Sequence, residues 1–159
     1  MEIKLRKADP DQLKIPPETM SGVVFGTQFT DHMFCMEWED GKGWHNAEIK
    51  PYGPLLMEPS AMVLHYAQMA FEGLKAYQTD SGEHVLFRPR ENFKRMNRTA
   101  QRMCLPELDI EEVLAALKQL LCLDSGWVPH ESGTSLYIRP TIVATEEAIG
   151  LKVSSKYLF

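Results

Sequence analysis

Residues 86–96, LFRPRENFKRM, are the stretch on which the interpretation of this chain depends. Arg88, Arg90, Lys94 and Arg95 fall within eight residues of a protein whose formal net charge is −5. A local reversal of charge is typical of a solvated helix face or of a site that binds an anion. The residues of this stretch leave both explanations open.

The same stretch begins a predicted helix over residues 91–104, because apolar side chains recur there at helical spacing. They are Phe93, Met96, Ala100 and Met103. Another helix is expected after Asp109, which forms a capping-box pattern with Glu112 three residues later. Both helices carry one apolar face, so each is expected to pack against a core.

The segment 60–71 is also predicted to be helical, with Ser60 as its N-cap and Gly73 as the residue that ends it. Alternating side chains and turn residues predict strands before and after it. Their approximate ranges are 30–37, 44–52, 74–78, 83–88 and 135–145, and residues 156–159 begin a further strand. Strands and helices in this order predict an α+β fold built of layers.

Length and composition predict one globular domain that does not have nucleic acid as its main partner. The chain has 159 residues, of which 44% are hydrophobic and 25% charged, and its pI is about 5.5. This balance is typical of a globular protein and argues against nucleic acid as the main partner. No run of 18 apolar residues and no signal-peptide pattern occurs, so we expect a cytoplasmic protein without a membrane span.

Cysteine and histidine spacings give no metal or redox motif. Cys35, Cys104 and Cys122 are widely spaced, so we expect reduced, buried thiols. The histidines form no i, i+4 pair and none lies near a cysteine at ligand spacing, so no metal site is expected. We interpret each as a surface or capping residue: His32, His45, His65, His84 and His130.

Another arginine stands out in SLYIRP, residues 135–140. Arg139 is one charge in an otherwise apolar predicted strand, where an unpaired charge is costly, so we expect it to meet a carboxylate. Tyr66, Phe71 and Tyr137 are large aromatic residues that serve either as core residues or as pocket walls. Composition and spacing alone name no reaction.

Several longer motifs occur in order along the chain: FGTQFTDHMF at 25–34, LHYAQMAFEGLKAY at 64–77, LFRPRENFKRM, WVP at 127–129 and GTSLYIRPT at 133–141. Together they resemble the branched-chain amino acid aminotransferases, which are pyridoxal-phosphate enzymes of fold type IV. The resemblance implies an N-terminal arm over residues 1–22 and the family's small N-terminal domain over residues 23–159. That domain is a two-layer α+β unit with a largely antiparallel sheet packed against helices.

The resemblance also implies an activity, the transfer of an amino group between leucine, isoleucine or valine and 2-oxoglutarate. Two alternatives stay open. One is another fold-type-IV enzyme, such as a D-amino acid aminotransferase or a relative of aminodeoxychorismate lyase. The other is a noncatalytic binding or dimerisation module.

Three positions acquire polar roles from the resemblance. Arg95 matches the arginine that holds the phosphate of the cofactor, a task that suits a planar guanidinium with paired donors. Tyr137 and Arg139 match residues beside the substrate, where they influence recognition of its carboxylate.

The remaining site residues are apolar or aromatic. The aromatic walls of the pocket for the branched side chain match Phe25, Tyr66 and Phe71. In the family, Tyr66 serves the site of the neighbouring subunit, as does the loop that contains Ile149 and Leu151. The resemblance therefore implies a homodimer with its site at the subunit interface.

The catalytic lysine of the family lies in a larger C-terminal domain, together with the groups that hold the cofactor ring. No lysine of this chain lies in the motif that carries it, so no catalytic residue is assigned. Because transamination needs that amine, we expect these 159 residues to lack the larger domain and to be inactive alone. Apolar faces left uncovered are expected to make the chain associate.

Overall fold

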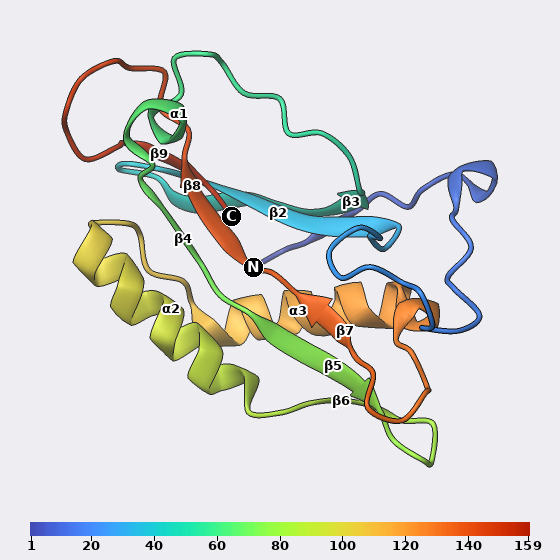
Figure 1. Ribbon diagram of the computed structural model, residues 1–159. Helices are drawn as coiled ribbons and strands as arrows, with labels where there is room; N and C mark the ends of the chain where they lie inside the picture. Colours follow the sequence, from blue (N-terminus) through green and yellow to red (C-terminus); the bar gives the residue numbers. More distant parts are fainter.

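One long antiparallel pair of strands runs through both sheets of the protein (Figure 1). The computed structural model describes all 159 residues. Each strand of this pair is interrupted once, which gives four elements: β4 (Met69–Phe71), β5 (Leu74–Gln78), β7 (Leu136–Ile138) and β8 (Thr141–Ala144). β4 pairs with β8 and β5 pairs with β7, both antiparallel and in one unbroken register. Between them the Glu72 amide donates to the Pro140 carbonyl at 2.9 Å. The ladder therefore bends, but does not end, at residues 72–73 and 139–140.

The larger sheet has six strands in the order β1-β3-β2-β9-β8-β4, and the smaller has three in the order β6-β5-β7. The other strands are β1 (Lys4–Leu5), β2 (His32–Glu39), β3 (Gly43–Pro51), β6 (His84–Leu86) and β9 (Lys156–Leu158). All neighbours are antiparallel except β1 and β3. The predicted strands at 30–37 and 44–52 are confirmed and pair as one hairpin, and those at 74–78 and 83–88 are confirmed and pair as another.

The two long helices lie together on one side of these strands, where α2 packs against β4 and α3 against β2 (Figure 1). The helical elements are α1 (Met62–Tyr66), α2 (Pro89–Met103) and α3 (Ile110–Leu123), with 3-10 turns η1 (Pro10–Gln12) and η2 (Ser125–Trp127). The core lies between the two layers and includes the fully buried Met36, Phe93, Met96, Ile142 and Tyr157. The predicted α+β fold of layers is thereby confirmed.

Both long helices begin close to the predicted positions. On α2 the predicted apolar positions Phe93, Met96 and Ala100 are buried, whereas Met103 at its end is exposed. Asp109 caps α3 by accepting the amides of Glu111 and Glu112 at 3.0 and 3.1 Å. The predicted capping box is half formed, because the Glu112 carboxylate accepts the N-terminal amine of the chain instead.

The predicted helix over residues 60–71 is confirmed only over Met62–Tyr66, and its N-cap is Ala61 rather than the predicted Ser60. α1 ends at Tyr66, and Ala67 takes a left-handed conformation with φ 51°. Residues 69–71 instead form β4, an edge strand whose ladder with β8 satisfies the backbone groups on one side. A strand partner far away in sequence thus outweighs the local helix preference. Gly73 lies at the bend of the ladder and ends no helix.

Two expectations about single residues are also wrong. His32 is not a surface residue but is 5% exposed, because it forms a buried pair with Asp124 between Nδ1 and Oδ1 at 2.6 Å. Cys35 is buried as expected, whereas Cys104 and Cys122 are exposed. None of the helices is both long enough and apolar enough to cross a membrane.

Candidate functional site

Four of the residues singled out in the sequence meet at the bend of the ladder. The Arg139 guanidinium carbon lies 4.4 Å from the centroid of the Phe71 ring, and Nη2 of Arg139 donates to the Tyr137 hydroxyl at 2.8 Å. Phe25 meets Tyr137 edge to face, with ring centroids 5.1 Å apart. We call Phe25, Phe71, Tyr137 and Arg139 the arginine–aromatic cluster.

Strand register explains why the cluster forms. Side chains alternate between the two sides of a strand. Phe71 therefore shares a side of the ladder with the residue opposite it on the partner strand, and with every second residue along either strand. Phe71 pairs with Thr141, and Lys75 pairs with Tyr137. These pairs place Arg139 between them, on the same side as Phe71 and Tyr137. Gly73, the residue opposite Arg139, has no side chain to obstruct them.

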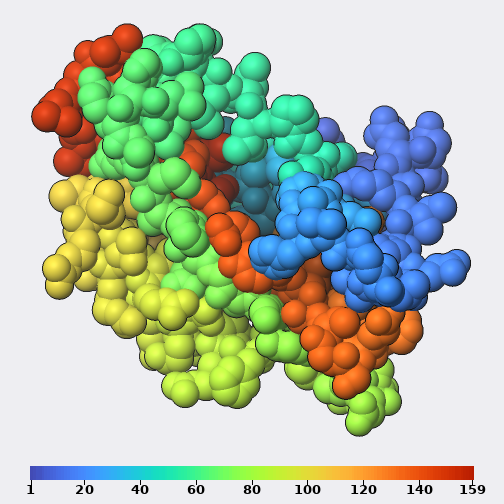
Figure 2. Space-filling view, viewed as in Figure 1, coloured from blue at the N-terminus to red at the C-terminus, as the bar shows by residue number.

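The cluster is open to solvent and is assembled from distant parts of the chain. Phe25 is 75% exposed and Phe71 58% exposed. In the space-filling view, the orange segment around β7 lies on the visible face between blue residues from the first fifth of the chain and the green of β4 (Figure 2). Single exposed apolar residues are common on protein surfaces, whereas several exposed aromatic side chains gathered around one cation indicate a binding site.

Arg139 has no carboxylate partner within the chain. Its side chain contacts Tyr137 and Phe71, and it forms none of the chain's nine ion pairs at up to 4.0 Å. The carboxylate expected from the sequence is therefore absent from these 159 residues. One N–H group of the guanidinium donates to Tyr137. The remaining N–H groups are able to donate hydrogen bonds to a carboxylate ligand.

Arg95 of α2, in contrast, is paired. Its Nε and Nη2 both donate to the carboxylate of Glu72, the second bond at 2.7 Å to Oε2. The Glu72 side chain is 4% exposed, whereas that of Arg95 is 60% exposed. The amide of Gly73 and the side chain of Asn92 also donate to this carboxylate, at 3.0 and 3.3 Å.

These hydrogen bonds fix the charge of the pair. The Arg95 guanidinium, with smaller help from Gly73 and Asn92, lowers the pKa of Glu72 against the opposing effect of burial. The carboxylate in turn raises the pKa of Arg95. Glu72 is therefore ionised, and the guanidinium has one edge committed to it.

Arg95 is joined to the cluster through one short stretch, residues 71–73. Glu72 follows Phe71 directly, so its side chain leaves the ladder on the other side, toward α2. Arg95 makes no hydrogen bond or ring contact with Tyr66, Tyr137 or Arg139. The two arginines are linked only through residues 71–73.

Tyr66, Ile149 and Leu151 have no part in the arginine–aromatic cluster. Tyr66 ends α1 and packs partly against the core. Ile149 and Leu151 are 73% and 92% exposed, on the loop between β8 and β9. This loop runs beside α1, where the Met62 amide donates to the Glu146 carbonyl at 2.9 Å (Figure 1). It lies at the far end of β8 from the bend.

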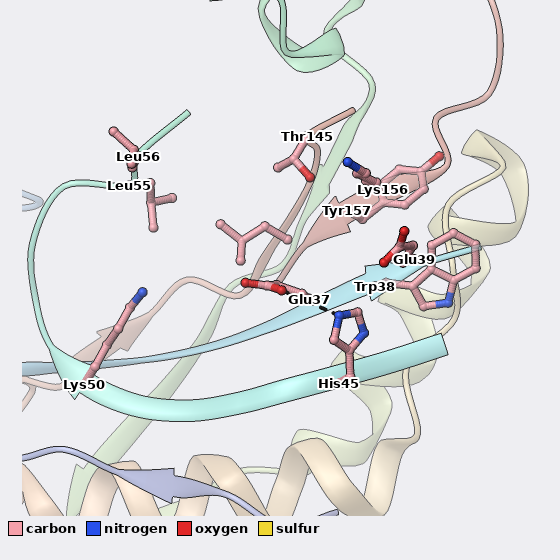
Figure 3. Close-up of a pocket in the computed structure, with 11 residues that line it drawn as sticks. Glu37, Trp38, Glu39, His45, Lys50, Leu55, Leu56, Thr145, Lys156 and Tyr157 are labelled. Atoms are coloured by element: carbon pink, nitrogen blue, oxygen red, sulfur yellow. Dashed lines mark ion pairs between the residues drawn. The ribbon is translucent and has the colours of Figure 1, made fainter. Parts of the chain in front are cut away.

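A hollow of about 420 Å³ lies elsewhere, over β2, β3 and β9 (Figure 3). Glu37 of β2 and His45 of β3 are cross-strand neighbours in its wall, with Oε2 and Nε2 3.6 Å apart. None of its lining residues belongs to the arginine–aromatic cluster or to the Arg95 pair. No group of three His, Cys, Asp or Glu side chains in the chain is placed to hold a metal ion.

Known proteins resemble this chain closely in sequence. Branched-chain-amino-acid transaminase 1 of Bacillus subtilis (strain 168) is 55% identical over 139 residues, which are 87% of this chain and 39% of the relative. Branched-chain-amino-acid aminotransferase 2 of the same strain is 48% identical over 154 residues, 97% of this chain and 40% of the relative. The cytosolic branched-chain-amino-acid aminotransferase of Saccharomyces cerevisiae is 47% identical over 142 residues, 89% of this chain and 38% of the relative.

The chain is homologous to part of the branched-chain-amino-acid aminotransferases. It spans about two fifths of the length of these family members. No family model matches it.

Solved structures of branched-chain aminotransferases share the fold. The Escherichia coli enzyme has a TM-score of 0.53 at 21% identity, covering 79% of this chain and 39% of that one. The enzyme of Thermoproteus uzoniensis with norvaline has a TM-score of 0.57 at 22% identity, with the same coverage. A third family enzyme, complexed with N-(5'-phosphopyridoxyl)-L-glutamate, has a TM-score of 0.55 at 23% identity, covering 77% and 38%. The chain has the α+β fold of part of these enzymes.

No site role was predicted from the sequence for Glu72, Gly73 or Asn92. All three lie within the motifs LHYAQMAFEGLKAY and LFRPRENFKRM, so a signal was present. It lay in the opposite charges of Glu72 and Arg95, which are 23 residues apart. Pairing them requires knowing that α2 folds back on the bend, and composition does not supply that knowledge.

Proposed function

We propose that this chain is the small N-terminal domain, residues 23–159 with an arm over residues 1–22, of a pyridoxal-phosphate-dependent branched-chain-amino-acid aminotransferase. The proposed reaction moves an amino group between leucine, isoleucine or valine and 2-oxoglutarate. The observation that carries the proposal is the state of Arg139, a guanidinium held in an exposed aromatic cluster without a carboxylate of its own.

Arg139 is proposed to bind the carboxylate of the substrate. Its contact with the Phe71 ring and its hydrogen bond to Tyr137 orient the guanidinium before any ligand arrives. A charge-assisted hydrogen bond to a carboxylate then forms with little further ordering of the side chain. Tyr137 accepts from Arg139, so its own hydroxyl hydrogen remains available to a ligand.

The aromatic side chains are proposed to select the substrate side chain. Phe25 and Phe71 offer exposed aromatic surface beside the guanidinium. An apolar wall favours branched aliphatic groups over polar ones, yet separates leucine, isoleucine and valine by only about 1–3 kcal/mol per methylene. We therefore expect all three to be substrates.

Arg95 is proposed to hold the phosphate of pyridoxal phosphate, which when bound supplies the electron sink for transamination. The residues present fit this role. Of the five N–H donors of a guanidinium, Arg95 gives two to Glu72. The other donors lie on a side chain that is 60% exposed, so an anion has access to them. The solved relative that is complexed with a phosphopyridoxyl compound supports a cofactor of this class.

A homodimer is proposed to complete the site. Tyr66, Ile149 and Leu151 lie away from the arginine–aromatic cluster of their own chain, and Ile149 and Leu151 are strongly exposed. Such an arrangement suits residues that serve the site of a neighbouring subunit. We place the protein in the cytoplasm, in line with the cytosolic yeast relative.

A chimera tests the proposal. These 159 residues would replace the corresponding part of the Bacillus subtilis transaminase 1, the rest of which supplies the catalytic lysine. We expect turnover of L-leucine with 2-oxoglutarate and none of D-alanine, and we expect the 159 residues alone to be inactive. A folded chimera that binds pyridoxal phosphate but does not turn over L-leucine would disprove the proposed function.

A further inference from the structure

The Glu72–Arg95 pair differs from the other ion pairs of α2. Lys94 pairs with Glu91 and Arg90 pairs with Glu111, and in both pairs the two side chains are about half exposed or more. Glu72 is almost completely buried, and its carboxylate accepts four hydrogen bonds, from Arg95 twice, from Gly73 and from Asn92. A carboxylate so surrounded is fixed in position.

The pairing is side-on. Glu72 engages Nε and Nη2 of Arg95, which leaves one hydrogen of Nη1 and one of Nη2 side by side on the outer edge of the guanidinium. That edge has the paired geometry that matches two oxygens of a phosphate. One guanidinium is therefore able to bridge a buried carboxylate and an outer anion.

We propose that Glu72 is a positioning residue: it fixes the guanidinium of Arg95 from behind, so that the outer edge of the guanidinium is presented to the cofactor phosphate. The inference rests on the proposed function, because it takes Arg95 to be the phosphate ligand. An arginine without this clamp samples many rotamers, and binding would have to remove part of that freedom. Asn92 supports the clamp by also donating to the Gly73 carbonyl at 3.1 Å, which ties α2 to the bend.

Two physical effects of Glu72 oppose each other, and this makes the proposal testable. Its negative charge repels a phosphate beside Arg95, so removing the charge alone would tighten anion binding. Its two hydrogen bonds hold the Arg95 guanidinium in one orientation, so removing them would weaken phosphate binding. The proposal requires the second effect to be the larger.

The experiment uses the whole chain with ¹⁵N-labelled arginine and inorganic phosphate as the probe. The Nε–Hε signal of Arg95, identified by its loss in Arg95→Lys, is followed by NMR during titration. We expect phosphate to shift this signal, and Glu72→Gln to weaken binding about 2- to 12-fold, the equivalent of ordering one long side chain. Glu91→Gln is the matched control, since it removes a carboxylate of the same helix without touching Arg95. We expect it to leave binding unchanged or slightly tighter.

The outcomes separate the two claims. If phosphate leaves the Arg95 signal unmoved in the unaltered chain, both the phosphate role of Arg95 and the inference fail. If the signal moves but Glu72→Gln binds phosphate equally or more tightly, the inference alone fails. Should Glu72→Gln not fold, Glu72→Asp takes its place, because it keeps the charge but withdraws the carboxylate from Arg95. Weaker phosphate binding by Glu72→Asp supports the inference, and unchanged binding overturns it.

Discussion

A β-carbon placed on Gly73 would lie 2.2 Å from the hydroxyl oxygen of Tyr137 and 3.0 Å from its ring carbon Cζ. Tyr137 therefore crosses the position where any other residue would carry a side chain. This crossing brings its hydroxyl to Arg139, where it accepts a hydrogen bond at 2.8 Å. The absence of a side chain at position 73 is thus part of how the arginine–aromatic cluster is built.

Gly73→Ala is expected to destabilise the chain by about 1–3 kcal/mol, the usual cost of forcing a methyl group into occupied space. Urea denaturation measures this change. Gly53→Ala is the matched control, because a β-carbon there has no neighbour within 4 Å, and its effect is expected to stay within about 0.5 kcal/mol. Equal stabilities of the two variants would contradict this cost and would mean that the Tyr137 ring moves aside freely.

The Glu72–Arg95 pair predicts a pH dependence of stability. Since the pKa of Glu72 is lowered in the folded chain, its contribution is fully present above the unfolded pKa of about 4.3. It is lost as the pH falls through the folded pKa. The stability gap between the unaltered chain and Glu72→Gln should therefore shrink as the pH is lowered from about 7 to about 3, as measured by urea denaturation. A gap that stays constant over this range would contradict the assignment of an ionised carboxylate.

His32 is predicted to fasten the N-terminal arm. Its Nδ1 donates to Asp124 at 2.6 Å while its Nε2 accepts the Ala8 amide at 2.9 Å, which fixes one neutral tautomer of the imidazole. His32→Phe leaves Asp124 without this partner, at an expected cost of about 1–3 kcal/mol. Hydrogen exchange should show faster exchange of the Ala8 amide, whereas His84→Phe, at an exposed histidine, should leave it unchanged. An Ala8 amide equally protected in both variants would rule out this anchor.

The cap of α3 gives a prediction about local stability. Asp109 accepts the amides of Glu111 and Glu112, so Asp109→Ala removes the partners of two otherwise unsatisfied donors. The expected loss is about 0.5–2 kcal/mol, measurable by thermal or urea unfolding. Asp109→Asn, which keeps an acceptor oxygen, should recover most of it. No loss in the alanine variant would mean that water replaces the cap without cost.

Much of the fold was predictable where the signal is local. The helix that contains Phe93, Met96 and Ala100 follows from apolar spacing, and the cap at Asp109 follows from residue type. The failure at residues 60–71 has a physical reason, since β4 depends on pairing with Thr141 and its neighbours far along the chain. Local preference carries no information about that partner.

The candidate site was predictable only through the family motifs, and only in part. The resemblance named Phe71, Tyr137 and Arg139, and the structure brings these three together. It did not name the partner of Arg95, because the contact with Glu72 arises from tertiary packing of α2 on the bend. The burial of His32 escaped prediction for the same reason, as Asp124 is 92 residues away.

The kinetics of the chimera with Arg139→Gln test whether Arg139 binds the carboxylate of the substrate. Loss of a hydrogen bond between charged groups costs about 1.5–3 kcal/mol, so kcat/KM for L-leucine should fall about 10- to 150-fold. Retention of pyridoxal phosphate by the variant would show that the cofactor site is intact. An unchanged kcat/KM would show that Arg139 does not bind the carboxylate of the substrate.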